Sequence, residues 1–195
     1  TRSRQVTGVQ TCALPILPIV TGDTERNFDE EYICFDLETT GLNANSDKII
    51  EIGAVRVKNR QIVEEFGTFA DPGMSLEEKT TELTGITDKM LEGAPSQKEA
   101  LQKFIDFCGD SPVLIAHNAN FDVSFVKATA KRENIKFEFT YADTVPMSRA
   151  LIMSIKNHKL DTVAKYLKIP SFNHHRACDD ARDRKSTRLN SSHLS

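Results

Sequence analysis

The sequence has no tryptophan, and it has no apolar run long enough to cross a membrane. The apolar stretch near its start, residues 14–20, contains Pro15 and Pro18 and is far shorter than the ~20 residues that a membrane-spanning helix needs. The same prolines interrupt the continuous apolar region that a signal peptide requires. We therefore expect no membrane partner.

Cysteine is also scarce. The four cysteines, at positions 12, 34, 108 and 178, show neither a Cys-x-x-Cys pair nor a zinc-finger spacing, which argues against a structural zinc site. Cys34 and Cys108 fall in apolar runs, where a thiol acts as a small buried side chain. Free thiols fit a reducing compartment, so we expect a cytoplasmic protein.

Positive charge is not in excess. The net charge is −3, and residues 23–182 hold 20 lysines and arginines against 27 aspartates and glutamates. This balance argues against a polycationic protein that binds nucleic acid over its whole surface. It remains compatible with a metal-dependent nuclease, because bound cations offset the carboxylates of such a site.

The length of 195 residues suits one domain with a sizeable core. Residues 1–22 and 183–195 resemble translated adapter sequence, and we assign both to segments outside the domain. We expect the domain to occupy residues 31–182. We also expect the native protein to extend beyond both ends.

Three strands are predicted in the first part of the domain, at residues 32–37, 49–57 and 61–70. Asn59 and Arg60 form a tight turn between the second and the third. Short connections of this kind predict an antiparallel meander.

Two helix starts carry capping-box pairs. Ser75 precedes Glu78 at the start of a short helix that should end near Gly85, and Ser96 precedes Glu99 at the start of a longer one.

Strands and helices alternate in the remaining part. We expect strands at 113–116 and 137–141, a helix at 121–133 with Phe121, Phe125 and Ala128 on one stripe, and helices at 144–152, 160–167 and from 177 onward. A meander followed by this alternation indicates an α/β fold with a mixed sheet.

The first strand carries the earliest candidate for chemistry. Asp36 and Glu38 stand two residues apart, so both side chains project from one face of the strand. Two such carboxylates repel each other, and a hard cation such as Mg²⁺ or Mn²⁺ between them removes the repulsion. Taken alone, the pair is equally well explained as two solvated acids at a strand end.

Two later segments favour the metal site. The strand at 113–116 runs into polar residues and then Asp122, while His175 and Asp180 stand five residues apart near the predicted last helix. Four acids and one histidine from separate segments resemble the pattern of the DEDD exonucleases whose fifth residue is histidine. The chain is thus similar to the DnaQ-like family, and within it to the exonuclease domains of PolC-type DNA polymerase III.

The resemblance covers about residues 31–182, and shorter matches at 82–87, 156–160 and 174–177 support it. It implies a ribonuclease-H-like exonuclease fold and a two-metal 3′–5′ exonuclease that releases nucleoside 5′-monophosphates, with a role in proofreading. Asp36 would bridge two Mg²⁺ or Mn²⁺ ions. Glu38 and Asp180 would bind one ion and Asp122 the other, and His175 would accept the proton of the attacking water.

Candidate substrate contacts flank these acids. Thr39 and Thr40 offer hydrogen bonds to the terminal nucleotide, and the family match gives Leu83 and Ile86 as an apolar wedge, although either is equally explained as core. We expect Asn118 to be a further substrate contact at a strand end. His158, with Lys156 and Lys159, forms a basic group that either meets the phosphate backbone or is a solvated face. We assign Asp143 to a helix N-cap and no catalytic role to His174 or Asp179.

The expected partner is DNA with a single-stranded or frayed 3′ end, together with a replicative polymerase in cis or in trans. An exoribonuclease or a repair exonuclease on the same fold is an alternative, because the motifs do not distinguish ribose from deoxyribose. A non-catalytic module that binds nucleic acid is another. It is disfavoured because all five motif positions are present and the domain is not basic.

The two adjacent histidines provide the test of the assigned base. His175→Ala should lower turnover by about 10²–10⁴-fold, the usual contribution of general-base catalysis. His174→Ala should lower it far less, because His174 lacks the five-residue spacing to Asp180. Steady-state hydrolysis of an oligonucleotide measures both variants, and equal losses would show that the base is misassigned.

Overall fold

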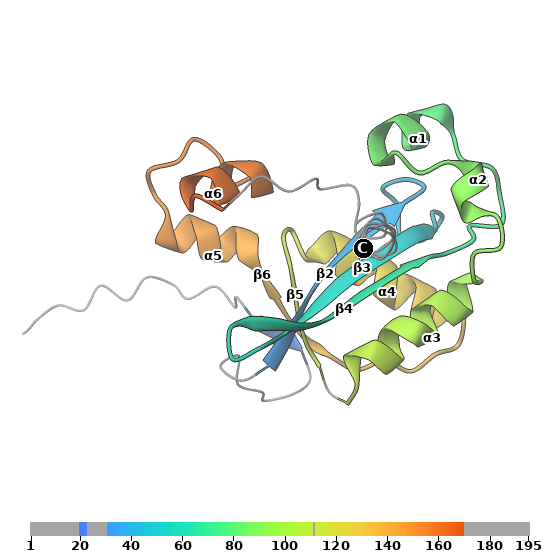
Figure 1. Ribbon diagram of the computed structural model, residues 1–195, viewed down its shortest axis with the longest axis horizontal. Helices are drawn as coiled ribbons and strands as arrows, with labels where there is room; N and C mark the ends of the chain where they lie inside the picture. The colour runs from blue at the N-terminus through green and yellow to red at the C-terminus, as the bar shows by residue number, and fades with distance from the viewer. Residues whose placement is uncertain (1–19, 23–30, 111, 170–195) are drawn as a thin grey trace, which may run out of the picture.

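The architecture is a mixed sheet of six strands in the order β1-β6-β5-β2-β3-β4, with helices around it (Figure 1). The computed structural model describes residues 20–22, 31–110 and 112–169. The strands are β1 (Val20–Gly22), β2 (Glu31–Thr39), β3 (Ile49–Lys58), β4 (Gln61–Phe69), β5 (Val113–Ala116) and β6 (Thr140–Asp143). The α/β fold class expected from the sequence is confirmed.

Strands β2, β3 and β4 form the predicted antiparallel meander. Asn59 and Arg60 both have positive φ, at 51° and 63°, as the two central residues of a type I′ turn require. The β2–β3 register shifts between Glu38 and Thr39, so the pairing becomes irregular where the candidate acids lie. The tight turn fixes the register of β4, and the irregularity bends the end of β2.

The other half of the sheet is mostly parallel. β5 runs parallel to β2 and β6 parallel to β5, so the C-terminal ends of β2, β5 and β6 meet at one edge of the sheet. β1 closes the far side, antiparallel to β6, with Val20 opposite Ala142. The three residues of β1 were expected to lie outside the domain, whereas their backbones belong to the sheet.

Six helices are described: α1 (Glu78–Thr84), α2 (Asp88–Leu91), α3 (Gln97–Cys108), α4 (Asn120–Arg132), α5 (Thr144–Leu151) and α6 (Leu160–Tyr166). In Figure 1, α5 and α6 lie together on one side of the sheet, and α1 and α2 lie on the other. None of the helices in the described ranges is long and apolar enough to cross a membrane.

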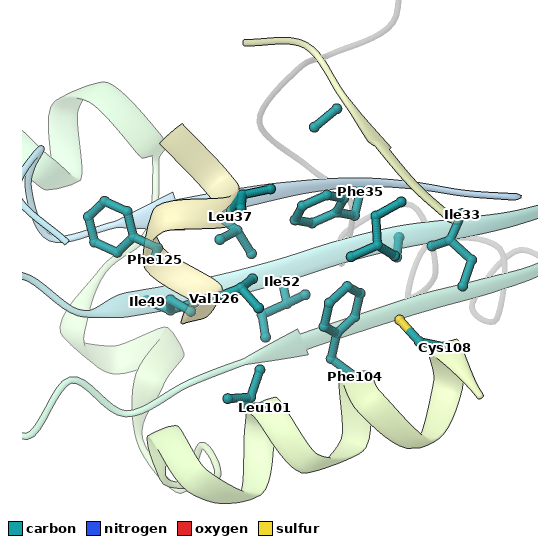
Figure 2. Close-up of a cluster of buried hydrophobic side chains, with 14 of the residues drawn as sticks. Ile33, Phe35, Leu37, Ile49, Ile52, Leu101, Phe104, Cys108, Phe125 and Val126 are labelled. Atoms are coloured by element: carbon teal, nitrogen blue, oxygen red, sulfur yellow. The ribbon is translucent and has the colours of Figure 1, made fainter. Parts of the chain in front are cut away.

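The main core lies between the sheet and helices α3 and α4. Phe104 of α3 is fully buried, and its ring centroid is 5.6 Å from that of Phe35 on β2. Phe125 and Val126 of α4 are also fully buried and face the same strands (Figure 2). This packing buries one face of β2 against the helices. The alternate side chains of the strand point to the opposite face, where the candidate acids lie.

Several expectations about local structure were wrong. Ser75 does not cap α1, whose N-cap is Glu77 with no side-chain hydrogen bond, whereas Ser96 and Glu99 form the full capping box of α3. The last strand begins at Thr140 and not at residue 137, because it pairs with β5 from Val113 onward.

The apolar stripe of α4 also differs from the expected one. Ala128 is half-buried, and the buried stripe instead includes Val123, Phe125, Val126 and Ala130. Cys108 is buried as expected, but Cys34 is only half-buried, since it lies on the outer face of β2.

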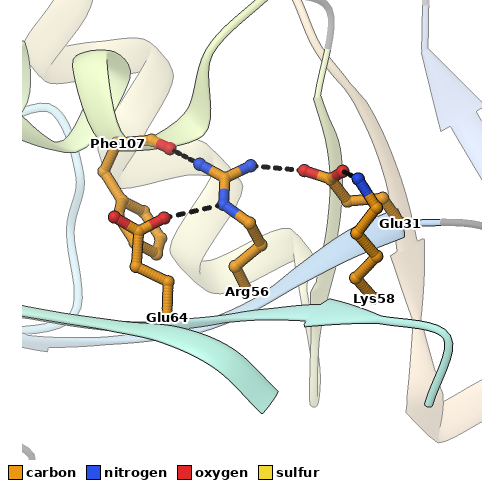
Figure 3. A network of polar contacts seen from close by, with 5 residues as sticks. All are labelled: Glu31, Arg56, Lys58, Glu64 and Phe107. Carbon is orange, nitrogen blue, oxygen red and sulfur yellow. Dashed lines mark hydrogen bonds and ion pairs between the residues drawn. The ribbon is translucent and has the colours of Figure 1, made fainter. Parts of the chain in front are cut away.

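An arginine joins four elements at the end of the sheet opposite the candidate acids (Figure 3). The Arg56 guanidinium on β3 donates to Glu31 at 2.5 Å, to Glu64 at 2.9 Å and to the carbonyl of Phe107. Its contacts therefore tie β3 to the start of β2, to β4 and to the end of α3. The network fixes the frame on which the first two acids are carried.

Candidate active site

Asp36 and Glu38 occupy the face of β2 that the core leaves open. Phe35 and Leu37, the residues before and between them, are each only 5% exposed and belong to the main core. Strand alternation then turns Asp36 and Glu38 to the other face, where Asp36 is exposed and Glu38 half-buried. This is the arrangement that the two-residue spacing predicts.

Asp122 reaches the same strand from the first turn of α4. Its side chain is 3% exposed, and its Oδ1 accepts a hydrogen bond from the backbone N–H of Leu37 at 3.1 Å. β5 ends at Ala116, and its pairing with β2 stops at Cys34, so the carboxylate satisfies an N–H that no strand partner reaches. Leu37 lies between Asp36 and Glu38, so this bond brings the third acid to the first two.

The three carboxyl groups affect one another electrostatically. Burial raises the pKa of the Asp122 carboxyl to about 8, and the negative charges of Asp36 and Glu38 contribute to the rise, against the lowering effect of backbone N–H groups. A carboxyl that holds its proton near neutral pH in this way releases it readily when a cation arrives. The cluster therefore places two acids beside a carboxyl that holds its proton near neutral pH.

A fourth acid, Glu51, lies beside this cluster and was not among the expected site residues. It stands directly opposite Glu38 in the β2–β3 register and is 5% exposed. Directly opposed like charges destabilise a strand pair, so Glu51 adds to the demand for a cation. The only signal in the sequence was a lone acid inside the apolar run 49–52.

These side chains fit a hard divalent cation, because every donor is a carboxylate oxygen. In the described part of the chain, no three His, Cys, Asp or Glu side chains are already grouped as ligands of one ion. The other two motif residues, His175 and Asp180, lie outside the described residues, as do His174 and Asp179. Of the five motif residues, Asp36, Glu38 and Asp122 lie in the described part of the chain, and they are near enough for the first two to raise the pKa of the third.

The two threonines after Glu38 form most of their hydrogen bonds with the loop that follows them. The Thr39 hydroxyl donates to the Gly41 carbonyl at 2.6 Å, and the Thr40 backbone N–H donates to the Lys48 carbonyl at 2.9 Å. The Thr40 hydroxyl accepts from the Lys48 N–H at 3.0 Å, which leaves its own proton as the donor for a substrate. A side chain at Gly41 would collide with the Asp47 carboxylate, so glycine is needed for the loop to close.

The two residues of the predicted apolar wedge differ in their exposure to solvent. Leu83 on α1 is 67% exposed, but Ile86 is 1% exposed and packs with Ile50 and Leu91 in a second small core. Ile86 therefore offers no surface to a substrate, and its assignment as a contact was wrong. Leu42, which is 84% exposed and just past the threonines, is an apolar surface that was not expected.

α1 is tied to the end of β2, because the Thr80 hydroxyl donates to the Thr40 carbonyl at 3.1 Å. Leu83 is on the same short helix. The exposed side chain of Leu83 is therefore held near the strand end that carries the acids.

A hydrogen bond between Asn118 and Asp143 joins the loop after β5 to the end of β6. Asn118 is exposed and has φ 66°, and its backbone N–H donates to Asp143 Oδ1 at 3.0 Å. The same oxygen accepts from Val145 N–H at 2.8 Å, so Asp143 is the N-cap of α5, as the sequence indicated.

His117 joins the loop after β5 to the loop before α6. Its Nε2 lies 2.8 Å from the His158 carbonyl, and its Nδ1 lies 2.8 Å from the Thr144 hydroxyl. A carbonyl can only accept, so Nε2 carries a proton. The His158 ring in turn lies 3.0 Å from the Ser148 hydroxyl on α5. These contacts fix the position of the predicted basic group, residues 156–159, against the strand ends.

Comparison with known sequences agrees with the motifs. The profile of the RNase_T family, described as exonuclease, matches residues 33–184. The PolC-type DNA polymerase III of Caldanaerobacter subterraneus is 47% identical over 166 residues, which cover 85% of this chain and 12% of that protein. That of Clostridium perfringens is 49% identical over 165 residues, covering 85% and 11%. The chain therefore spans only a small part of these relatives.

Solved structures show the same fold. A structure of exonuclease I has a TM-score of 0.66 at 16% identity and covers 75% of this chain and 37% of that one. Escherichia coli exonuclease I in complex with a dA16 oligonucleotide has a TM-score of 0.65 at 15% identity, with the same coverage. The ribonuclease-H-like exonuclease fold expected from the resemblance is confirmed.

The raised pKa of Asp122 predicts how stability depends on pH without metal. Between the ordinary value of about 3.9 and the folded value, the folded chain holds one more proton than the unfolded chain. Stability should therefore fall by up to about 1.4 kcal/mol per pH unit as pH rises through this window. In Asp122→Asn the amide oxygen can still accept from Leu37, and this fall should disappear.

Denaturant unfolding in excess chelator across the window measures the effect. Asp110→Asn, which removes an exposed carboxylate after α3, is the matched control and should follow the wild-type pH dependence. If Asp122→Asn shows the same fall in stability as the wild type, the carboxyl does not hold its proton in the folded chain.

Proposed function

Because the chain belongs to the RNase_T family of exonucleases, we propose that it is a metal-dependent 3′–5′ exonuclease that removes nucleotides from single-stranded or frayed DNA ends. The observation that supports this most is the buried Asp122, held against β2 between Asp36 and Glu38. A buried carboxyl beside two further acids lowers the stability of the fold. Such an arrangement is therefore better explained by a functional site, here one that binds divalent cations.

The reaction is hydrolysis of the terminal phosphodiester. Two Mg²⁺ or Mn²⁺ ions, when bound, would supply an activated water and stabilise charge on the scissile phosphate. Asp36, Glu38 and Asp122, with Asp180, are the residues that would hold them, since all four offer only oxygen ligands. His175 would accept the proton of the attacking water and hand it to solvent.

The surroundings of the acids suit a terminal nucleotide. The Thr40 hydroxyl accepts from the Lys48 N–H, so its own proton is left to donate to a nucleotide at the end of β2. The exposed side chains of Leu42 and Leu83 provide apolar surface for a base. A base that packs on such surface has to leave its neighbour in the duplex, and unpairing costs least at a mismatch or in a single strand. The oligonucleotide complexes of exonuclease I support a single-stranded substrate by fold-level analogy.

The sequence relatives suggest the setting. They are PolC-type DNA polymerases III, so we place the activity in proofreading during DNA replication in the cytoplasm, with a polymerase in cis or in trans as partner. A non-catalytic binding module is less well supported, because residues 31–143 hold 20 acids against 12 lysines and arginines.

The test is digestion of a labelled primer with and without divalent ions. The chain should shorten the primer from its 3′ end in Mg²⁺ or Mn²⁺, and excess chelator should stop it, because the carboxylates bind substrate phosphate only through cations. A primer with a mismatched 3′ end should be digested faster than the paired one.

Asp36→Ala should nearly abolish the reaction, whereas Asp110→Ala, which removes an exposed acid away from the cluster, should leave it unchanged. Full activity in chelator would refute the metal requirement. Faster digestion of the paired end would argue against proofreading.

A further inference from the structure

The charge of the domain is divided unevenly along the chain. Residues 31–143 carry 20 acids and 12 lysines and arginines, whereas residues 144–169 carry five cationic side chains and one acid. The five are Arg149, Lys156, Lys159, Lys165 and Lys168. The segment formed by α5, the loop 152–159 and α6 with the residues up to 169, called here the basic arm, is thus a cationic region on an acidic domain.

The cations of the basic arm are open to solvent. All five side chains are exposed, and in the described ranges none of them forms an ion pair. Elsewhere in the described ranges, Arg56, Lys58 and Lys136 form ion pairs with acids. A cluster of exposed cations on an otherwise acidic protein favours an anionic ligand that comes from outside.

The arm also presents flat and apolar surface between these charges. Tyr166 is 50% exposed and Leu167 is 53% exposed, and they lie between Lys165 and Lys168 at the end of α6. Exposed aromatic rings interleaved with cations are the combination that binds single-stranded nucleic acid, because bases stack while lysines contact phosphates.

The position of the arm fits a strand that leaves the active site. β6 leads directly into α5, and β6, β5 and β2 end at the same edge of the sheet, where the three acids gather. In Figure 1, α5 and α6 lie across this edge from α1. The His117 contacts to Thr144 and to the His158 carbonyl hold the base of the arm.

We propose that the basic arm binds the phosphate backbone of the single DNA strand upstream of the terminal nucleotide, through Lys165 and Lys168, with Tyr166 stacking on a base. This inference rests on the proposed function for the direction of the strand. It assigns to α6 a surface separate from the carboxylate cluster. Lys165 and Lys168 therefore govern affinity for long substrates and leave the chemical step alone.

The experiment compares Lys165→Gln/Lys168→Gln with Lys98→Gln/Lys103→Gln. The second pair removes the same charge from two exposed lysines on α3, away from the arm. Binding of a fluorescent oligothymidylate is measured in an Asp36→Ala background, so that it is not digested. The slope of log affinity against log salt should become shallower by about 1.4 in the arm variant, which is about 0.7 for each phosphate of a single strand that is no longer neutralised. The slope of the α3 variant should not change.

Kinetics of the same lysine pairs with Asp36 intact separate the arm from the chemistry. In the arm variant, kcat/KM should fall for the oligothymidylate and stay unchanged for a dinucleotide, because the single phosphodiester of a dinucleotide is the one that is hydrolysed. Equal salt slopes for the two lysine pairs would overturn the proposal. So would an equal loss on both substrates.

The two proposals fail in different ways. If the wild-type chain does not hydrolyse DNA but the arm variant still loses salt-dependent binding, the exonuclease proposal fails and the binding surface stands. If the wild type hydrolyses DNA and the arm variant binds like the α3 control, the binding surface fails alone.

Discussion

The active-site end of the sheet depends on one hydrogen bond between a carboxylate and a strand. Asp122 accepts from the Leu37 N–H, and this contact places a helix-borne acid between two strand-borne acids. The bond exists because β5 is too short to pair with this part of β2, so the backbone donor needs another acceptor. The structure uses the same carboxyl to complete the sheet and to build an anionic cluster.

The consequence is a cluster of acids whose negative charges oppose one another. Four acids, including the buried Glu51, lie on two neighbouring strands and a helix start, and Asp122 and Glu51 are almost entirely removed from water. Burying like charges is unfavourable unless protons or cations neutralise them. The raised pKa of Asp122 indicates that a proton does so in the metal-free chain.

Much of this could be read from the sequence, because its signals are local. Apolar runs and the tight turn at Asn59 and Arg60 located β2 to β4. The two-residue spacing of Asp36 and Glu38 placed both on one face. The Ser96–Glu99 capping box was likewise visible in four residues.

What could not be predicted depends on contacts between distant segments. Glu51 became part of the cluster only through the β2–β3 register, and the burial of Ile86 only through its packing with Ile50 and Leu91. The start of β6 was set by its pairing with β5 and not by its own apolar run, and Ser75 failed as a cap because the helix begins later. No window along the chain contains this information.

The central claim is that binding of a divalent cation displaces the proton of the Asp122 carboxyl, which passes to the buffer. Titration calorimetry with Mn²⁺ in buffers of different ionisation enthalpy counts the protons released on binding. The account predicts release of about one proton per chain near pH 6.5, diminishing above about pH 8 and absent in Asp122→Asn. A binding heat that does not depend on the buffer near neutral pH would contradict it.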